Sequence, residues 1–130
     1  MILLYSLFMK LAKPCYFLGS SKKDISAMPD DVKSAIGSAL FLAQTGSEAP
    51  HVKAIKGFGG RGVLEVIEDH DGDTYRAVYT VKFASAVYVL HAFQKKSKSG
   101  IATPKKELDL IASRLRDAEF LHRHLAAQEK

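Results

Sequence analysis

Four residues of this chain carry side chains that could do chemistry together: Arg76, His91, Lys95 and Lys96. Guanidinium and ammonium groups bind phosphate oxygens and stabilise negative charge on them. A histidine beside them can act as an acid, as a base or as a hydrogen-bond donor to phosphate. The other interpretation of His91 is a buried, hydrogen-bonded histidine, because its segment is otherwise apolar. By residue type, these four side chains could therefore bind a phosphate group and transfer a proton.

Positive charge surrounds this group in the sequence. The formal net charge at pH 7 is +5, and no Asp or Glu occurs at residues 49–64 or 76–106. The acids lie mainly in the predicted helices and in the turn at 68–73. The exclusion of negative charge from two loops predicts a polyanionic partner, and a solvated lysine run is the alternative. The candidate RNA-binding residues are Lys53, Lys56, Arg61, Lys82, Lys98 and Lys105.

Two motifs suggest a ligand, and both fail a positional test. Residues 57–62 match the pattern GxGxxG, but a dinucleotide fingerprint follows a strand, whereas this segment precedes one. Residues 69–73 alternate oxygen ligands, yet the positions where a calcium loop needs glycine and a carboxylate hold Thr74 and Thr80. A hairpin turn at 71–72 is favoured instead. The sequence predicts no metal and no cofactor.

Length and composition are those of one ordinary domain over residues 1–130. The chain is 47% hydrophobic and 25% charged, which excludes a disordered or fibrous protein. The apolar run at 1–8 has no preceding charge, no cleavage site and too few residues for a membrane span, so we predict no membrane partner. Met9 is an alternative start, and residues 1–12 are expected to be poorly ordered or extended. The single Cys15, in an apolar stretch, predicts a packed thiol and a cytoplasmic location.

Apolar spacing and turn residues predict an α+β fold. It has two N-terminal helices, an antiparallel meander sheet of three to four strands and a C-terminal helix. In chain order the predicted elements are a strand at 15–18, a helix capped by Ser20 or Ser21, a helix from Asp30 to a stop at Gly46, strands at 63–68, 74–82 and 86–93, and a helix after Thr103-Pro104. Simple hairpin counting puts Arg76 and His91 on opposite faces, and a one-residue slip would reverse that, so their placement stays open.

Five segments follow one another in a specific order: 56–59, 62–66, 74–79, 90–97 and Thr103-Pro104. In order and spacing they resemble the HigB-like, phage-derived branch of the RelE/ParE toxin superfamily. The likeness covers Cys15 to about Arg116 and agrees with the predicted strands and helices.

This resemblance implies a type II toxin that enters the ribosomal A site and cleaves messenger RNA without a metal. It also implies a helix-turn-helix, HigA-like antitoxin that silences the toxin. Attack of the ribose 2′-hydroxyl on the adjacent phosphate needs alignment, proton transfer and charge stabilisation. Arg76 matches the family's strand arginine, and Lys95 and Lys96 match the basic residues after its last strand, so the resemblance implies that these three bind the phosphate and stabilise its charge. His91 becomes the proton-transfer candidate, and these four are the predicted catalytic residues.

Two positions depart from the family pattern. Where RelE carries lysines in the first meander strand, this chain has Glu65 and Ile67. No tyrosine follows Tyr88 to stand for the C-terminal catalytic tyrosine of RelE. A ParE-like toxin that binds DNA gyrase without catalysis is an alternative, and so is an inactive homologue that keeps only antitoxin binding.

Overall fold

The structure, a computed structural model, describes residues 12–59, 62–95 and 103–128. The expectation for the N-terminus falls almost entirely on residues 1–11, which lie outside the described residues. The α+β class is confirmed, with two helices before the meander and a long helix after it. The elements are β1 (Cys15–Phe17), α2 (Ser21–Ser26), α3 (Asp30–Gln44), β2 (Val52–Ala54), β3 (Val63–His70), β4 (Asp73–Thr80), β5 (Val87–Lys95) and α4 (Lys105–Gln128).

The sheet has five strands in the order β1-β5-β4-β3-β2, and it is wider than the predicted meander. β3, β4 and β5 form that meander. β1 adds a parallel edge beside β5, and β2 adds an antiparallel edge beside β3. β2 is absent from the strands predicted from sequence, because a three-residue strand with one buried residue, Val52, is too short to show a period of two.

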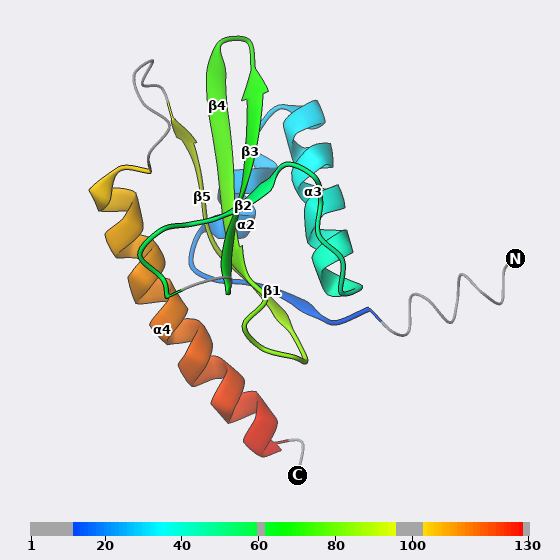
Figure 1. Cartoon of the computed structure of the whole chain (residues 1–130), viewed down its shortest axis with the longest axis vertical. Helices are drawn as coiled ribbons and strands as arrows, with labels where there is room; N and C mark the ends of the chain where they lie inside the picture. The colour runs from blue at the N-terminus through cyan, green and yellow to red at the C-terminus, as the bar shows by residue number, and fades with distance from the viewer. Residues whose placement is uncertain (1–11, 60–61, 96–102, 129–130) are drawn as a thin grey trace, which may run out of the picture.

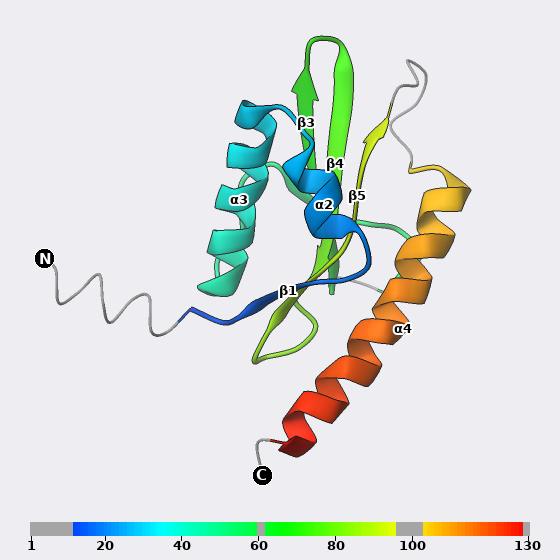
Figure 2. The ribbon, with the colours of Figure 1, turned by 180° about the vertical axis from the view of Figure 1, so that it is seen from behind.

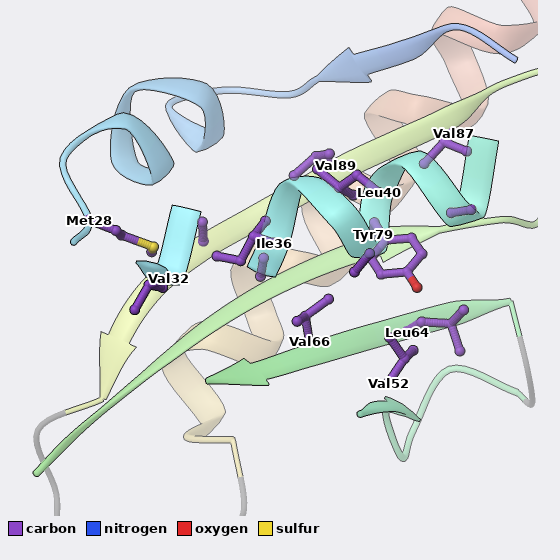
Figure 3. Close-up of a cluster of buried hydrophobic side chains, with 14 residues drawn as sticks. Met28, Val32, Ile36, Leu40, Val52, Leu64, Val66, Tyr79, Val87 and Val89 are labelled. Carbon is purple, nitrogen blue, oxygen red and sulfur yellow. The ribbon is translucent and has the colours of Figure 1, made fainter. Parts of the chain in front are cut away.

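Helices cover both faces of the sheet. α2 and α3 pack on one face and α4 on the other, so that α3 and α4 lie on opposite sides of the strands in Figure 1 and in Figure 2. Apolar side chains spaced three and four residues apart on α3 form one core against the sheet, with Ile36 and Tyr79 fully buried in it (Figure 3). A second core lies under α4 and includes Ile111 and Leu90. The meander is therefore buried on both sides over most of its length.

The β3–β4 hairpin turns where the sequence predicted it. Asp71 and Gly72 both have positive φ, 48° and 82°, as the two central residues of a type I′ turn require. This geometry confirms the hairpin reading of residues 69–73.

An irregularity in the β4–β5 ladder decides which face each strand residue occupies. Tyr79 pairs with Val89, but the next pair is Val78 with His91, so Leu90 is an extra residue, a β-bulge. Beyond the bulge, Arg76 pairs with Phe93. Because the bulge shifts the register by one residue, His91 shares the α4 face of the sheet with Arg76, contrary to simple hairpin counting.

No helix within the described ranges is long and apolar enough to cross a membrane.

Candidate functional site

A pocket of about 660 Å³ opens on the α4 side of the sheet. Four of the predicted residues line it, namely Lys53, Lys56, Arg76 and Lys95. We call it the basic pocket. The other lining residues come from the segment around β2, from β3 and β4, from the start of α4 and from the residues just before it: Pro50, His51, Ala54, Ile55, Glu65, Ile67, Asp69, Thr74, Thr103 and Leu108.

Strand pairing brings the charged lining residues together from distant parts of the sequence. Lys53 pairs with Glu65 across β2 and β3. Arg76 pairs with Ile67, two residues beyond Glu65, and Lys95 pairs with Thr74. Directly and diagonally paired residues share one face of a sheet. The strand register thus determines which charged residues form the pocket floor, and sequence spacing alone does not specify that register.

A buried ion pair lies in the floor of the basic pocket. Arg76 Nη1 donates to Glu65 Oε1 at 2.9 Å and to Thr103 Oγ1 at 3.0 Å. Arg76 is 3% exposed and Glu65 is 6% exposed. Thr103 in turn donates to the Glu65 carboxylate, with separations of 3.3 and 3.4 Å to its two oxygens. Thr103, which precedes the predicted C-terminal helix, therefore directs its hydroxyl to the charged pair in the pocket floor.

The expectation of a cationic cluster without nearby carboxylates is wrong. Glu65 binds Arg76, and Asp69 also lines the basic pocket. Residues 76–106 contain no acid in the sequence, but antiparallel pairing places β3, which carries Glu65 and Asp69, beside β4 in space. Four cations against two carboxylates still leave a surplus of two positive charges among the described lining residues. The pocket therefore still favours an anionic ligand.

The sequence analysis missed His51 as a member of this site. His51 is exposed and lies at the rim beside β2, one residue before Val52. The signal that could have identified it is its position in the acid-free stretch that also holds Lys53 and Lys56. The pocket thus contains an imidazole, two carboxylates and four cations among its described lining residues.

His91 lies outside the lining of the basic pocket. It is 6% exposed and lines a smaller cavity of about 360 Å³ with Asp24, Tyr75 and Glu107. Its Nε2 is hydrogen-bonded to Glu107, its Nδ1 to Arg114 at 3.2 Å, and its ring stacks on Phe93. The structure thus shows the buried, hydrogen-bonded histidine that was the alternative interpretation, and a catalytic role for His91 stays a prediction.

A protein-family model of phage derived proteins, the Gp49-like family, matches residues 23–116. The chain belongs to this family. Gp49-like proteins are a RelE/toxin-like family, so the predicted membership of the RelE superfamily is confirmed. Among solved structures the chain is similar to a mutant of the E. coli toxin RelE in the free state, with 20% identity and a TM-score of 0.46, over 62% of this chain and 81% of that chain. No curated protein matches the sequence.

The region shared with the Gp49-like family contains the whole described pocket. Every lining residue, from Pro50 to Leu108, lies within the matched range. Two other predicted residues lie away from the pocket and bind acids on α4: Lys82 contacts Glu119 at 3.3 Å and Lys105 contacts Asp109 at 2.9 Å.

Three predicted residues, Arg61, Lys96 and Lys98, lie outside the described residues. Cys15 is half-buried, and burial raises the pKa of its thiol to about 11. This agrees with a packed thiol, since the thiolate is the nucleophilic form.

Proposed function

We propose that this Gp49-like protein is a type II toxin that cleaves messenger RNA on the ribosome, with the basic pocket as its active site. The observation that supports this most directly is the gathering of Lys53, Lys56, Arg76 and Lys95 around His51 and Glu65 in one cavity. Its volume, about 660 Å³, is in the range of small-ligand pockets. The cationic surplus suits a phosphodiester backbone.

The chemistry that these groups support is internal transfer at phosphorus. The ribose 2′-oxygen forms a bond to the adjacent phosphorus while the bond from phosphorus to the 5′-oxygen breaks. The products are a 2′,3′-cyclic phosphate and a 5′-hydroxyl. A base must take the 2′-hydroxyl proton, an acid must protonate the leaving oxygen, and cations must stabilise the charge on the phosphate.

We assign these roles by position in the pocket. Arg76, Lys95 and Lys53 stabilise the phosphate, with Lys56 contacting the flanking backbone. Glu65 is held ready as the base, because Arg76 and Thr103 orient its carboxylate toward the sheet face that forms the pocket floor. His51 is the acid.

In this proposal His91 is not assigned to proton transfer, and the predicted basic residues outside the pocket bind RNA or ribosome. His91 was the proton-transfer candidate from sequence, but bonds to Glu107 and Arg114 occupy both of its ring nitrogens. We therefore assign proton transfer to the pocket residues. Arg61, Lys96 and Lys98, together with Lys82 and Lys105, are proposed to contact RNA or ribosome outside the pocket. The proposed silencing partner is a helix-turn-helix, HigA-like antitoxin.

A purified translation system with one defined message tests the proposal. His51→Gln and Lys53→Gln change exposed side chains, so loss of activity is not confused with loss of folding. We expect wild-type protein to cut the message within codons and to leave 5′-hydroxyl ends. His51→Gln should slow cleavage by about 10²-fold or more, the usual contribution of a general acid. Lys23→Gln on α2, also exposed and outside the pocket, is the control and should cleave normally.

Two outcomes would overturn the enzymatic assignment. Intact message together with inhibited DNA supercoiling would indicate a ParE-like toxin that binds gyrase. Intact message and no growth arrest on induction, with antitoxin binding retained, would indicate an inactive homologue.

A further inference from the structure

Arg114 of α4 contacts three separate segments of the chain, and no role follows for it from the proposed chemistry. Its Nη1 donates to the Leu90 carbonyl oxygen at 3.0 Å and to His91 Nδ1 at 3.2 Å. Its Nη2 lies 3.5 Å from Ser20 Oγ. The guanidinium thus joins α4 to β5 and to the turn that precedes α2.

The first of these contacts lies at the β-bulge. Leu90 is the extra residue between the pairs Tyr79 with Val89 and Val78 with His91. A bulge leaves its extra residue out of the regular ladder, so a side chain that binds its carbonyl stabilises the irregularity. The face of Arg76 follows from alternation along β4, whereas this bulge in β5 sets the register that places His91 and Lys95 on the same α4 face.

The second contact determines where the His91 ring carries its proton. A guanidinium donates hydrogen bonds and accepts none, so His91 Nδ1 must act as the acceptor. The proton of the neutral ring then resides on Nε2, which donates it to the Glu107 carboxylate. Glu107 lies in the first turn of α4, next to Leu108, which lines the basic pocket.

The third segment leaves room for the guanidinium only because it contains glycine. Gly19 has a φ of +54°, and a Cβ atom there would lie 2.6 Å from Arg114 Cζ. Real Cβ atoms do not approach other heavy atoms so closely, so the absence of a side chain at Gly19 is a condition for the Arg114 position.

We propose that Arg114 is a positioning residue for the basic pocket. By holding the bulge and the Nε2-protonated form of His91, it anchors Glu107 and the start of α4. From there Thr103 reaches Arg76 and Glu65, and Leu108 closes one wall. The consequence for catalysis rests on the proposed function, whereas the structural consequence does not.

Nitrogen-15 NMR of the histidine rings tests the structural part directly. In wild-type protein His91 should carry its proton on Nε2, and a proton on Nδ1 would overturn the proposal without any variant. Arg114→Met keeps the aliphatic stem and removes the donors, so His91 should become a mixture of the two forms. Arg114→Lys keeps a donor and should restore the Nε2 form in part. Arg116→Met, at an exposed position two residues further on, should leave the ring spectrum unchanged.

Amide exchange reports whether the start of α4 is anchored. The Leu108 N–H donates to the Pro104 carbonyl oxygen at 3.0 Å in the first turn. Arg114→Met should speed exchange of this amide by about tenfold or more, the factor expected for losing one charge-assisted hydrogen bond. Unchanged exchange and an unchanged His91 spectrum in this variant would refute the anchoring role.

A pair of glycine variants separates this role from general destabilisation. Gly19→Ala forces the Arg114 side chain to move, although no side chain of the network is removed from the sequence. Gly46→Ala imposes a similar left-handed residue, φ +84°, where no atom lies within 4 Å of the added Cβ. We expect Gly19→Ala alone to change the His91 ring spectrum. Equal spectra in the two variants would contradict the proposal.

Message cleavage is measured last, so that the two proposals can fail separately. Arg114→Met and Gly19→Ala should lower kcat about tenfold, with the Gly46→Ala protein as reference. If wild-type protein cleaves nothing, the proposed function fails, while the NMR and exchange results still decide the role of Arg114. If both variants cleave at the wild-type rate despite a changed ring spectrum, the link from Arg114 to the pocket is refuted.

Discussion

Removal of either partner of the Arg76–Glu65 pair should destabilise the protein strongly. Arg76 and Glu65 are 3% and 6% exposed, and Arg76 Nη1 lies 2.9 Å from Glu65 Oε1. Each charge is therefore removed from water and is compensated largely by the other. Arg76→Met leaves the Glu65 carboxylate buried with only part of its compensation. Breaking a buried pair in this way costs about 3–5 kcal/mol. Glu65→Leu should cost a similar amount, because it leaves the guanidinium without its carboxylate.

The double variant Glu65→Leu/Arg76→Met is the informative measurement. Replacement of a whole buried pair by apolar residues of similar volume is often close to neutral. We therefore expect the double variant to be at least about 3 kcal/mol more stable than the sum of the single changes implies. The assay is urea unfolding of the four proteins, followed by circular dichroism. Lys105→Ala provides the exposed control: its side chain is 87% exposed, and its pair with Asp109 should contribute less than about 1 kcal/mol.

Strict additivity, or single changes below about 1 kcal/mol, would refute this reasoning. The pair would then be screened by solvent, and the pocket floor would be wetter than the structure indicates. The result also governs how activity is interpreted. If Arg76 variants are only partly folded, their inactivity says nothing of catalysis, which is why the cleavage test above uses His51 and Lys53.

Three further predictions concern titratable groups elsewhere. A hydrogen bond from His70, 2.9 Å from Asp31, lowers the pKa of that carboxyl below its ordinary value of 3.8. The stability from this contact should be present above about pH 3.8 and be lost below it, and in His70→Gln an NMR titration should show the Asp31 pKa back near its ordinary value. Burial and the charge of Glu48 raise the pKa of Tyr79 to about 12, and its buried hydroxyl has no hydrogen-bond partner among the described residues. Tyr79→Phe should therefore not lower stability at pH 7. Wild-type protein should lose stability as pH rises above 10, the ordinary pKa of tyrosine in the unfolded chain, and the variant should not show this loss. A variant that is destabilised in thermal unfolding at pH 7 would contradict the prediction. With a pKa near 11 instead of 9.0, Cys15 should react with iodoacetamide at pH 7 about a hundredfold more slowly than in the unfolded chain, and equal rates would show that the thiol is not desolvated.

Local patterns in the sequence were sufficient for the fold class and for every described element except β2. The apolar positions of α3, from Val32 to Ala43, are the ones that the structure buries. Asp71 and Gly72 turn the predicted hairpin, and β5 is buried from Val87 to Ala92 as its uniform apolar character indicated. These features depend on residues close together in the chain, whose preferences are expressed before any distant contact forms.

The composition of the candidate site was decided only by the tertiary structure. One extra residue at Leu90 reverses the face of His91 relative to Arg76, because side chains alternate with a period of two. Pairing of β3 with β4 brings Glu65 to Arg76, although the sequence around Arg76 contains no acid for thirty residues toward the C-terminus. His51 lines the pocket because the three-residue edge strand β2, which follows it, pairs with β3. His91 does not line the pocket and is hydrogen-bonded to Glu107 and Arg114 instead. Charge along a chain is a property of the sequence, whereas charge in a pocket depends on register, which distant backbone pairing sets.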